Sequence, residues 1–171
     1  MGWRGASRYG NKRAIVDIIA IDQTMPADTI AIASDHAGFE LKSMLQEELA
    51  ELGFAVLDLG ANDTQSVDYP DFAYALTEAV REGRVERGVL VCGSGIGISM
   101  AANRAPEIRA ALIHDAFGAR MARQHNDANV ICFGGRTIGS DVARDCLRVF
   151  LETEFEGGRH ARRVDKLSNP A

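Results

Sequence analysis

Cysteine and basic charge are both scarce in this sequence, and each scarcity argues against particular kinds of site or partner. The 171 residues include three cysteines and no CxxC pair, which argues against a disulfide framework or a zinc site and fits a reducing cytoplasm. A net charge of −5 argues against a nucleic-acid-binding surface. No apolar run approaches the ~20 residues of a membrane span. The four histidines lack HExxH spacing, so no metal site is predicted. We therefore expect a cytoplasmic protein without nucleic-acid or membrane partners.

Apolar and charged residues are present in ordinary globular amounts, 46% and 25% of the chain. Residues 1–24 stand out, because "MGWRGASRYGNKR" is basic and glycine-rich. We expect an N-terminal extension there, either a flexible arm or an artefact of start-codon choice. Met25 looks like a natural start, and we expect residues 25–171 to form a single domain.

Short β-rich runs alternate with helical periodicity from residue 29 onward. Strands are predicted at residues 29–34, 55–60, 87–93, 109–114 and 128–135, with helices between them. This alternation is typical of βαβ units with right-handed crossovers. The sequence therefore predicts a three-layer α/β/α sandwich with a five-stranded parallel sheet, whose ligands would lie at the carboxyl ends of the strands.

The segment "GVLVCGSGIGIS" joins a predicted strand to a helix through three glycines. Glycines there let backbone N–H groups turn toward an anion, and Ser94 adds a hydroxyl donor. The spacing fits neither a Walker A loop nor a dinucleotide fingerprint. A tight turn without a ligand is the alternative. Cys92 ends the strand, and it is open whether its thiol fills the core or is reactive.

Two other motifs pair a histidine with a polar neighbour. Asp35 and His36 follow the first strand, where they could bind sugar hydroxyls or move protons, although Asp35 could instead cap a helix. His125 and Asn126 stand at a helix end. There the histidine could simply interact with the helix dipole, and the asparagine could be the left-handed residue that ends the helix.

The C-terminal "GGRHARRV" contains Arg159 and Arg163, which share a face if the segment is helical. Two guanidiniums on one face suit a phosphate, and a solvated basic tail is the alternative. Cys132 lies mid-strand and Cys146 inside a helix, so both are interpreted as core residues.

Together, "SDHAGFELK", "DYPDFA", "GVLVCGSGIGISMAANR", "RQHNDANV" and "EGGRHARRV" resemble, in order and spacing, the type B ribose-5-phosphate isomerases and their galactose-6-phosphate isomerase relatives. The resemblance covers roughly residues 29–165 and gives the N-terminal extension no role. It implies a Rossmann-like domain in a homodimer or tetramer with active sites at the subunit interface. It also implies interconversion of ribose 5-phosphate and ribulose 5-phosphate in the pentose phosphate pathway, through an enediolate and without metal or other cofactor.

The resemblance also implies individual roles. Cys92 is the base that moves the proton between C1 and C2, and His125 opens the furanose ring. Independently of the resemblance, the Ser94 hydroxyl is a suitable catalytic donor to the oxygen that gains charge in the enediolate. Family members without the cysteine use a glutamate at the position of Ile98. The implied substrate-binding residues are Asp35, His36, Gly93, Ser94, Gly95, Ile96, Gly97, Asn126, Arg136, Arg159 and Arg163.

Two alternatives stay open at this point. The same chemistry could act on another sugar phosphate, such as erythrulose 4-phosphate, galactose 6-phosphate or allose 6-phosphate. The glycine loop could also belong to a non-catalytic module that binds a nucleotide or another metabolite.

Overall fold

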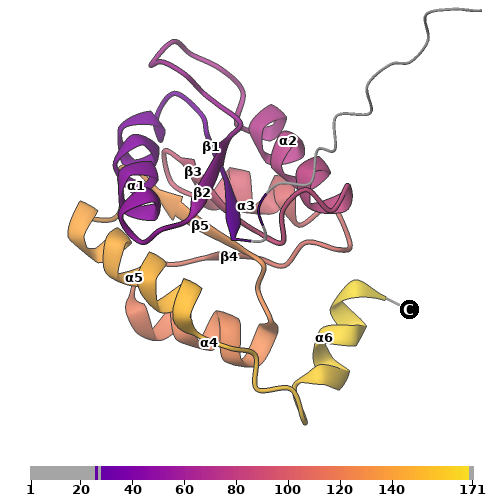
Figure 1. Ribbon diagram of the computed structural model, residues 1–171. Coiled ribbons are helices and arrows are strands. Elements are labelled where there is room, and N and C mark those ends of the chain that lie inside the picture. Colours follow the sequence, from indigo (N-terminus) through magenta and orange to yellow (C-terminus); the bar gives the residue numbers. More distant parts are fainter. Residues whose placement is uncertain (1–25, 27, 170–171) are drawn as a thin grey trace, which may run out of the picture.

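Five parallel strands form the centre of the molecule. The computed structural model describes residue 26 and residues 28–169, so the extension predicted over residues 1–24 lies outside the described residues. The strands stand in the order β2-β1-β3-β5-β4, and every neighbouring pair is parallel (Figure 1). They are β1 (Thr29–Ser34), β2 (Ala55–Asp58), β3 (Arg87–Cys92), β4 (Ala110–Leu112) and β5 (Val130–Gly134). The predicted sheet is confirmed, although the second and fourth strands are shorter than expected.

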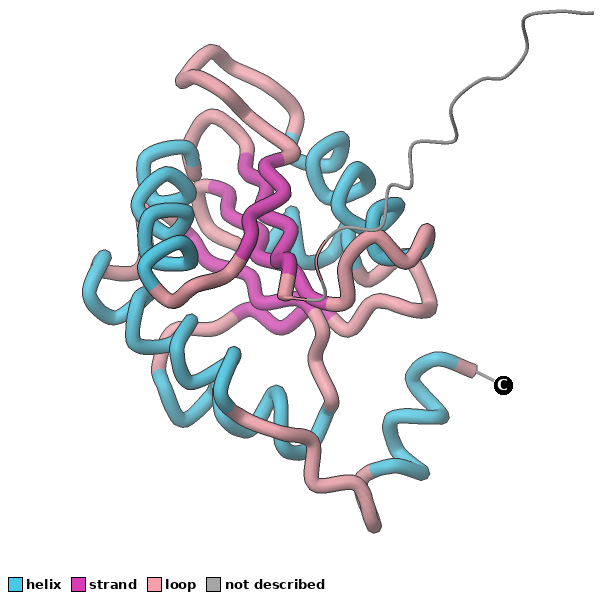
Figure 2. The backbone as a smooth tube through the Cα atoms, in the orientation of Figure 1, coloured by secondary structure: helices cyan, strands magenta, loops and turns pink. Residues whose placement is uncertain are grey.

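Helices cover both faces of the sheet, as Figure 2 shows. On one face α1 (Phe39–Glu51) and α4 (Ala116–Asn126) both contact α5 (Ser140–Glu152). On the other face α2 (Tyr69–Arg81) packs against α3 (Ile96–Ala102). The three-layer sandwich is thereby confirmed. The last helix, α6 (Ala161–Ser168), stands apart from these layers and buries none of its side chains.

The core is divided by the sheet into two apolar layers. Along β1, Ile30 and Ile32 point to the layer of α1, α4 and α5, whereas Ala31 and Ala33 point to the layer of α2 and α3. Because both faces of a parallel sheet are covered, its strands are apolar throughout rather than alternating with polar residues. The layer of α2 and α3 contains many small residues, among them Ala31, Ala33 and Ala73.

A buried ion pair ties α1 to β2. The ammonium of Lys42 is 1% exposed and donates to both carboxylate oxygens of Asp58, at 2.7 and 2.8 Å. Burial by itself would raise the pKa of Asp58, but the bonds from Lys42 and from the Gly60 N–H outweigh it and hold that pKa below the ordinary value.

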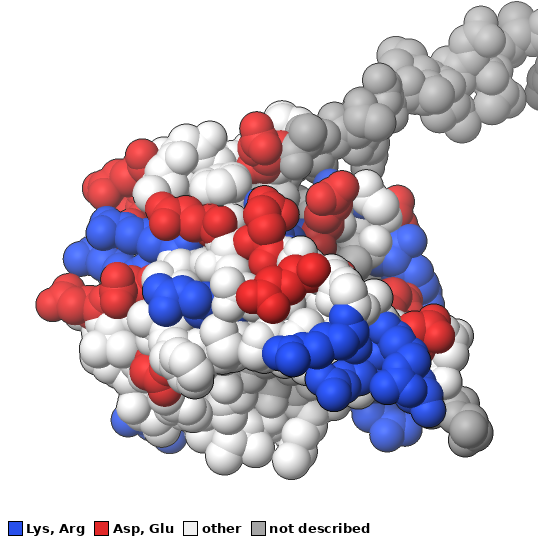
Figure 3. Space-filling view, turned by 90° about the horizontal axis from the view of Figure 1, so that it is seen from below, with Lys and Arg blue, Asp and Glu red and all other residues white. Residues whose placement is uncertain are grey.

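Charge is unevenly distributed on the surface. The largest group of basic side chains on the face that Figure 3 shows lies at the lower right, with smaller basic groups elsewhere on that face, although the chain as a whole is acidic. The C-terminal segment contributes a basic set of its own, namely Arg159, Arg162, Arg163 and Lys166. None of the helices in the described part of the chain is long and apolar enough to cross a membrane.

Candidate active site

A pocket of about 480 Å³ opens at the carboxyl ends of β1, β3 and β5. Three loops meet there because the carboxyl ends of neighbouring parallel strands lie at one edge of the sheet. The pocket is lined by Asp35, His36, Ala37, Tyr69, Cys92, Gly93, Ser94, Gly97, Arg136 and Thr137. Seven of these residues were predicted from the sequence as site residues, six on the two segments that follow β1 and β3 and the seventh, Arg136, on the segment that follows β5.

Cys92 is both a core residue and a pocket residue. It is 4% exposed and packs in the apolar layer beneath α2 and α3, yet it borders the pocket. The N–H of Gly95 donates to its Sγ at 3.1 Å. A backbone donor is therefore aimed at the sulfur beside the pocket. The core interpretation is confirmed, and because Cys92 also lines the pocket, the reactive role of its thiol stays a prediction.

Some of the hydrogen-bonding groups of the glycine loop, residues 93–97, are used within the loop and its preceding strand. Besides the contact from Gly95 to the sulfur, the N–H of Ile96 donates to Ser94 Oγ at 3.3 Å. Gly95 is buried and the side chain of Ile96 is half exposed, and neither residue lines the pocket. The part of the loop that faces the pocket consists of Gly93, Ser94 and Gly97. The surface presented to a ligand is thus narrower than the predicted run from Gly93 to Gly97.

Asp35 and His36 are held in place by hydrogen bonds to different segments of the backbone. Asp35 is 6% exposed, and its Oδ1 accepts from the N–H groups of Ala37 and Gly38 at 2.9 and 3.0 Å. It fixes the turn before α1, whereas the N-cap residue of that helix is Gly38, so the helix-cap interpretation of Asp35 was wrong. The Nδ1 of His36 lies 3.2 Å from the nitrogen and 3.3 Å from the oxygen of Val67, which anchors the ring to the loop before α2.

Three residues that line the pocket were not predicted from the sequence, namely Ala37, Tyr69 and Thr137. A Cβ at Gly97 would lie 2.6 Å from Cζ of Tyr69, so the tyrosine ring rests directly on the glycine loop. The motif "DYPDFA" was one of those that carried the family resemblance, but its tyrosine received no role. Arg136 approaches Gly93, where a Cβ would lie 3.6 Å from its Nη1, and it brings a guanidinium to the pocket.

The remaining predicted residues, His125, Asn126, Arg159 and Arg163, do not line this pocket. Helix α4 starts beyond the carboxyl end of β4 and runs back to the start of β5, so its last turn lies toward the opposite edge of the sheet. The left-handed residue at that end is Asp127, with φ 46°, and Asn126 is the last helical residue. The assignment of the left-handed conformation to Asn126 was therefore wrong.

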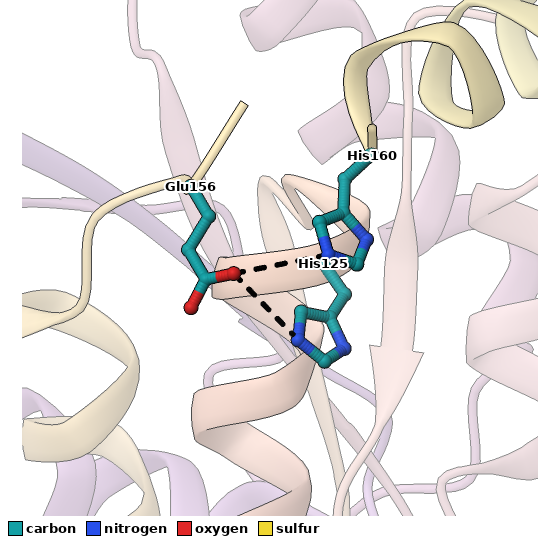
Figure 4. A group of neighbouring side chains, drawn as sticks. All are labelled: His125, Glu156 and His160. Atoms are coloured by element: carbon teal, nitrogen blue, oxygen red, sulfur yellow. Dashed lines mark ion pairs between the residues drawn. The ribbon is translucent and has the colours of Figure 1, made fainter. Parts of the chain in front are cut away.

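The C-terminal segment returns to this end of α4. The N–H of Glu156 donates to the carbonyl of Gln124 at 3.1 Å. The imidazole rings of His125 and His160 stack, with centroids 4.1 Å apart and planes 4° from parallel (Figure 4). Oε2 of Glu156 lies 3.9 Å from Nε2 of His125 and 3.7 Å from Nε2 of His160. We call His125, Glu156 and His160 the histidine cluster.

The histidine cluster has the residue types of a metal site but not the geometry. Its three ligand atoms lie within 4.8 Å of one another. The lone pair of an imidazole nitrogen lies in the ring plane, so two nearly parallel rings cannot direct their lone pairs at one ion. Nε2 of His160 also accepts a hydrogen bond from Nε of Arg159 at 3.2 Å. Holding a metal ion here would require one ring to rotate and that bond to break.

Known proteins resemble the chain over nearly all of its described part. Residues 30–167 match the family model described as Ribose/Galactose Isomerase. Ribose-5-phosphate isomerase B of Escherichia coli is 41% identical over 139 residues, which are 81% of this chain and 93% of that protein. D-erythrulose-4-phosphate isomerase of Pectobacterium atrosepticum is 41% identical over 140 residues, 81% of this chain and 92% of that protein.

Solved structures agree with these sequence relatives. Ribose-5-phosphate isomerase B of Clostridium thermocellum is 47% identical and superposes with a TM-score of 0.81, covering 82% of this chain and 95% of that chain. The resemblance inferred from the motifs is thereby confirmed, and so is the Rossmann-like fold. With its fold, its sequence and its motifs in agreement, this chain belongs to the Ribose/Galactose Isomerase family.

Proposed function

We propose that this protein is an aldose–ketose isomerase that interconverts ribose 5-phosphate and ribulose 5-phosphate. The observation that carries the proposal is the position of Cys92, whose sulfur accepts a backbone hydrogen bond at the edge of a pocket that also contains a carboxylate, an imidazole and a guanidinium. The family and the name of the Escherichia coli relative support this choice of substrate.

Cys92 acts as the base that moves a proton between C1 and C2 through an enediolate. As a thiolate it would remove the proton from one carbon and return it to the other, and the Gly95 N–H stabilises the charge on the sulfur meanwhile. The enediolate gains charge on oxygen, and Ser94 lies beside Cys92 on the pocket wall as a hydroxyl donor. Donors aimed at such an oxygen commonly contribute about 3 kcal/mol each to lowering a barrier.

The phosphate requires cations at the far end of the substrate from C1 and C2. Arg136 is the cationic residue of the described pocket wall, and Arg159 and Arg163 belong to the C-terminal segment. Forked guanidinium donors suit a phosphate, and binding energy gained there positions the reacting carbons without touching them.

The distance between the two groups of residues has a simple explanation if two chains share each site. The pocket of Cys92 opens at the carboxyl edge of the sheet, whereas His125, Arg159 and Arg163 lie on segments that do not reach it. We infer a symmetric homo-oligomer in which the histidine cluster and the arginines of one copy complete the pocket of the other. An isologous pairing would complete two sites at once.

Mixing two inactive variants tests this arrangement. Cys92→Ala and His125→Ala, refolded together, should form mixed dimers with one intact site, recovering about a quarter of the wild-type activity. If each chain contained a whole site, the mixture would remain as inactive as its components.

The proposed reaction is tested directly by ribulose 5-phosphate formation from ribose 5-phosphate in the presence of EDTA. Cys92→Ala should reduce kcat by at least a hundredfold while the substrate still binds, because general bases contribute about 10²–10⁴-fold. Cys146→Ala, which removes a buried thiol of α5, is the matched control and should retain activity. Near-normal turnover by Cys92→Ala would exclude the proposed base.

The Pectobacterium relative supports a second candidate, erythrulose 4-phosphate. A four-carbon 4-phosphate cannot form the phosphorylated furanose, so it would not need His125 for ring opening. Comparing kcat/KM for four-, five- and six-carbon sugar phosphates distinguishes the candidates. A tetrose phosphate preferred over ribose 5-phosphate, with no effect of His125→Ala, would favour the second.

A further inference from the structure

We propose that His160 is a positioning residue that aligns the ring-opening imidazole and a phosphate-binding guanidinium at the same time. Its ring fixes His125 by stacking, and its Nε2 fixes Arg159 by accepting a hydrogen bond. This inference rests on the proposed function, because it assumes that His125 opens the sugar ring and that Arg159 binds the phosphate.

The two stacked rings are not equivalent. His160 is 6% exposed, whereas the side chain of His125 is 36% exposed. The buried ring is also tied through its backbone, since its N–H donates to Gly157 O at 2.9 Å and its carbonyl accepts from the N–H groups of Arg163 and Val164. His160 is therefore the fixed member of the pair, and the accessible His125 is the member that can meet a substrate.

The glycines before His160 make this placement possible. Gly157 and Gly158 have φ values of 62° and 54°, two consecutive left-handed residues that side chains disfavour. They reverse the chain between Glu156, which is bonded to α4, and His160. The turn in "EGGRH" thus returns the imidazole of His160 to the end of α4, where it lies beside His125 (Figure 4).

The bond from Arg159 determines what His160 can do. Because Nε of Arg159 donates to Nε2 of His160, that nitrogen carries no proton of its own. Burial, followed by repulsion from His125 and Arg159, lowers the pKa of His160; Arg163 acts in the same direction and Glu156 opposes it. A neutral His160 whose Nε2 is occupied is a poor proton carrier, which leaves proton exchange to His125.

The same bond orients Arg159. Only its Nε is used by His160, so the terminal nitrogens of the guanidinium stay available for a phosphate. One buried ring thereby sets the distance between the group that opens the sugar ring and a group that holds the phosphate. Misplacing either group by about 1 Å could reduce turnover about a hundredfold.

Two substitutions separate these two contacts. His160→Gln can keep an acceptor near the position of Nε2 but has no ring, and His160→Phe keeps a ring but no acceptor. In His160→Gln we expect kcat from ribose 5-phosphate to fall about tenfold to a hundredfold with little change in KM. In His160→Phe we expect kcat to stay within a few-fold and KM to rise about tenfold.

The direction of the reaction provides a further readout. Ribulose 5-phosphate is an open chain, because its C5 oxygen is phosphorylated, so the reverse reaction needs no ring opening. His160→Gln should therefore remain near the wild type when it starts from ribulose 5-phosphate. The proposal would be overturned if His160→Gln lost equal kcat in both directions, or if His160→Gln and His160→Phe changed kcat and KM alike. A residue that merely supports the fold would give either result. His114→Gln, an exposed histidine outside the pocket, is the matched control.

An NMR measurement makes the outcome independent of turnover. Stacking shifts the ring proton signals of His125, and these shifts should disappear in His160→Gln and persist in His160→Phe, with thermal melts confirming that both variants fold. If the wild type isomerised no sugar phosphate, the proposed function would be wrong, but the NMR measurement would still show whether His160 holds the ring of His125 by stacking. Unchanged His125 signals in His160→Gln would refute the positioning role.

Discussion

Gly95→Ala perturbs the glycine loop at the residue whose N–H donates to the sulfur of Cys92. Gly95 has φ 76°, and a Cβ there would lie 2.4 Å from Cδ1 of Leu112 and 2.9 Å from the carbonyl carbon of Phe133. The left-handed conformation costs an alanine about 1–2 kcal/mol. Forcing a methyl group against the backbone of β5 costs about 1–3 kcal/mol more. We therefore expect Gly95→Ala to lower the free energy of unfolding by about 2–5 kcal/mol in urea titration.

Gly53→Ala is the matched control, because Gly53 has φ 88° and nothing within 4 Å of its Cβ position. It should lose only the conformational part, about 1–2 kcal/mol. The folded fraction of Gly95→Ala should also show a kcat about a hundredfold lower, because its N–H no longer points at the sulfur of Cys92. Equal losses of stability in the two variants would refute the packing argument. Full activity in folded Gly95→Ala would refute the role of the N–H donor.

Three further predictions concern buried ionisable groups. Asp58→Asn leaves the ammonium of Lys42 buried without its counter-charge, and we expect the free energy of unfolding, measured by urea titration, to fall by about 3 kcal/mol. This is the lower end of the range for breaking a buried pair, because Asp58 is 35% exposed. The pKa of Asp58 is lower in the folded than in the unfolded chain, so its contribution to the free energy of unfolding is complete above the ordinary value of 3.8 and is lost as the pH falls further. The melting temperature of Asp58→Asn should therefore fall less steeply in acid than that of the wild type. Burial raises the pKa of Cys146 to about 11 and that of Cys132 still higher, so neither thiol should be alkylated at about pH 8 before the protein unfolds. Mass spectrometry that found either cysteine alkylated in the folded protein would contradict this prediction.

The pocket could be predicted because parallel strands leave little freedom in where their carboxyl ends lie. Once the strand ending at Cys92 and the strand before Asp35 were recognised, their carboxyl ends had to lie at the same edge of the parallel sheet. Strand order was not available from the pattern. It is the insertion of β5 between β3 and β4 that brings Arg136 beside Gly93.

The histidine cluster could not be predicted from the sequence pattern. His125 and His160 are 35 positions apart, and their stacking depends on a turn of two left-handed glycines, which no periodicity describes. Tyr69 was missed for a similar reason, because its contact with Gly97 depends on how α2 and α3 pack. Local patterns indicate elements and strand ends, whereas contacts between side chains of separate helices depend on the assembled packing.

Helix α6 buries none of its side chains, although its segment carries arginines proposed to hold the phosphate. The free energy that keeps the domain folded therefore places little constraint on which residues occupy the outer positions of this helix. Selection for a different sugar phosphate could change these positions without first finding compensating mutations in the core. For protein engineering, the positions of α6 other than Arg163 are thus a natural place to diversify substrate preference while the fold and the proposed phosphate contact are left unchanged.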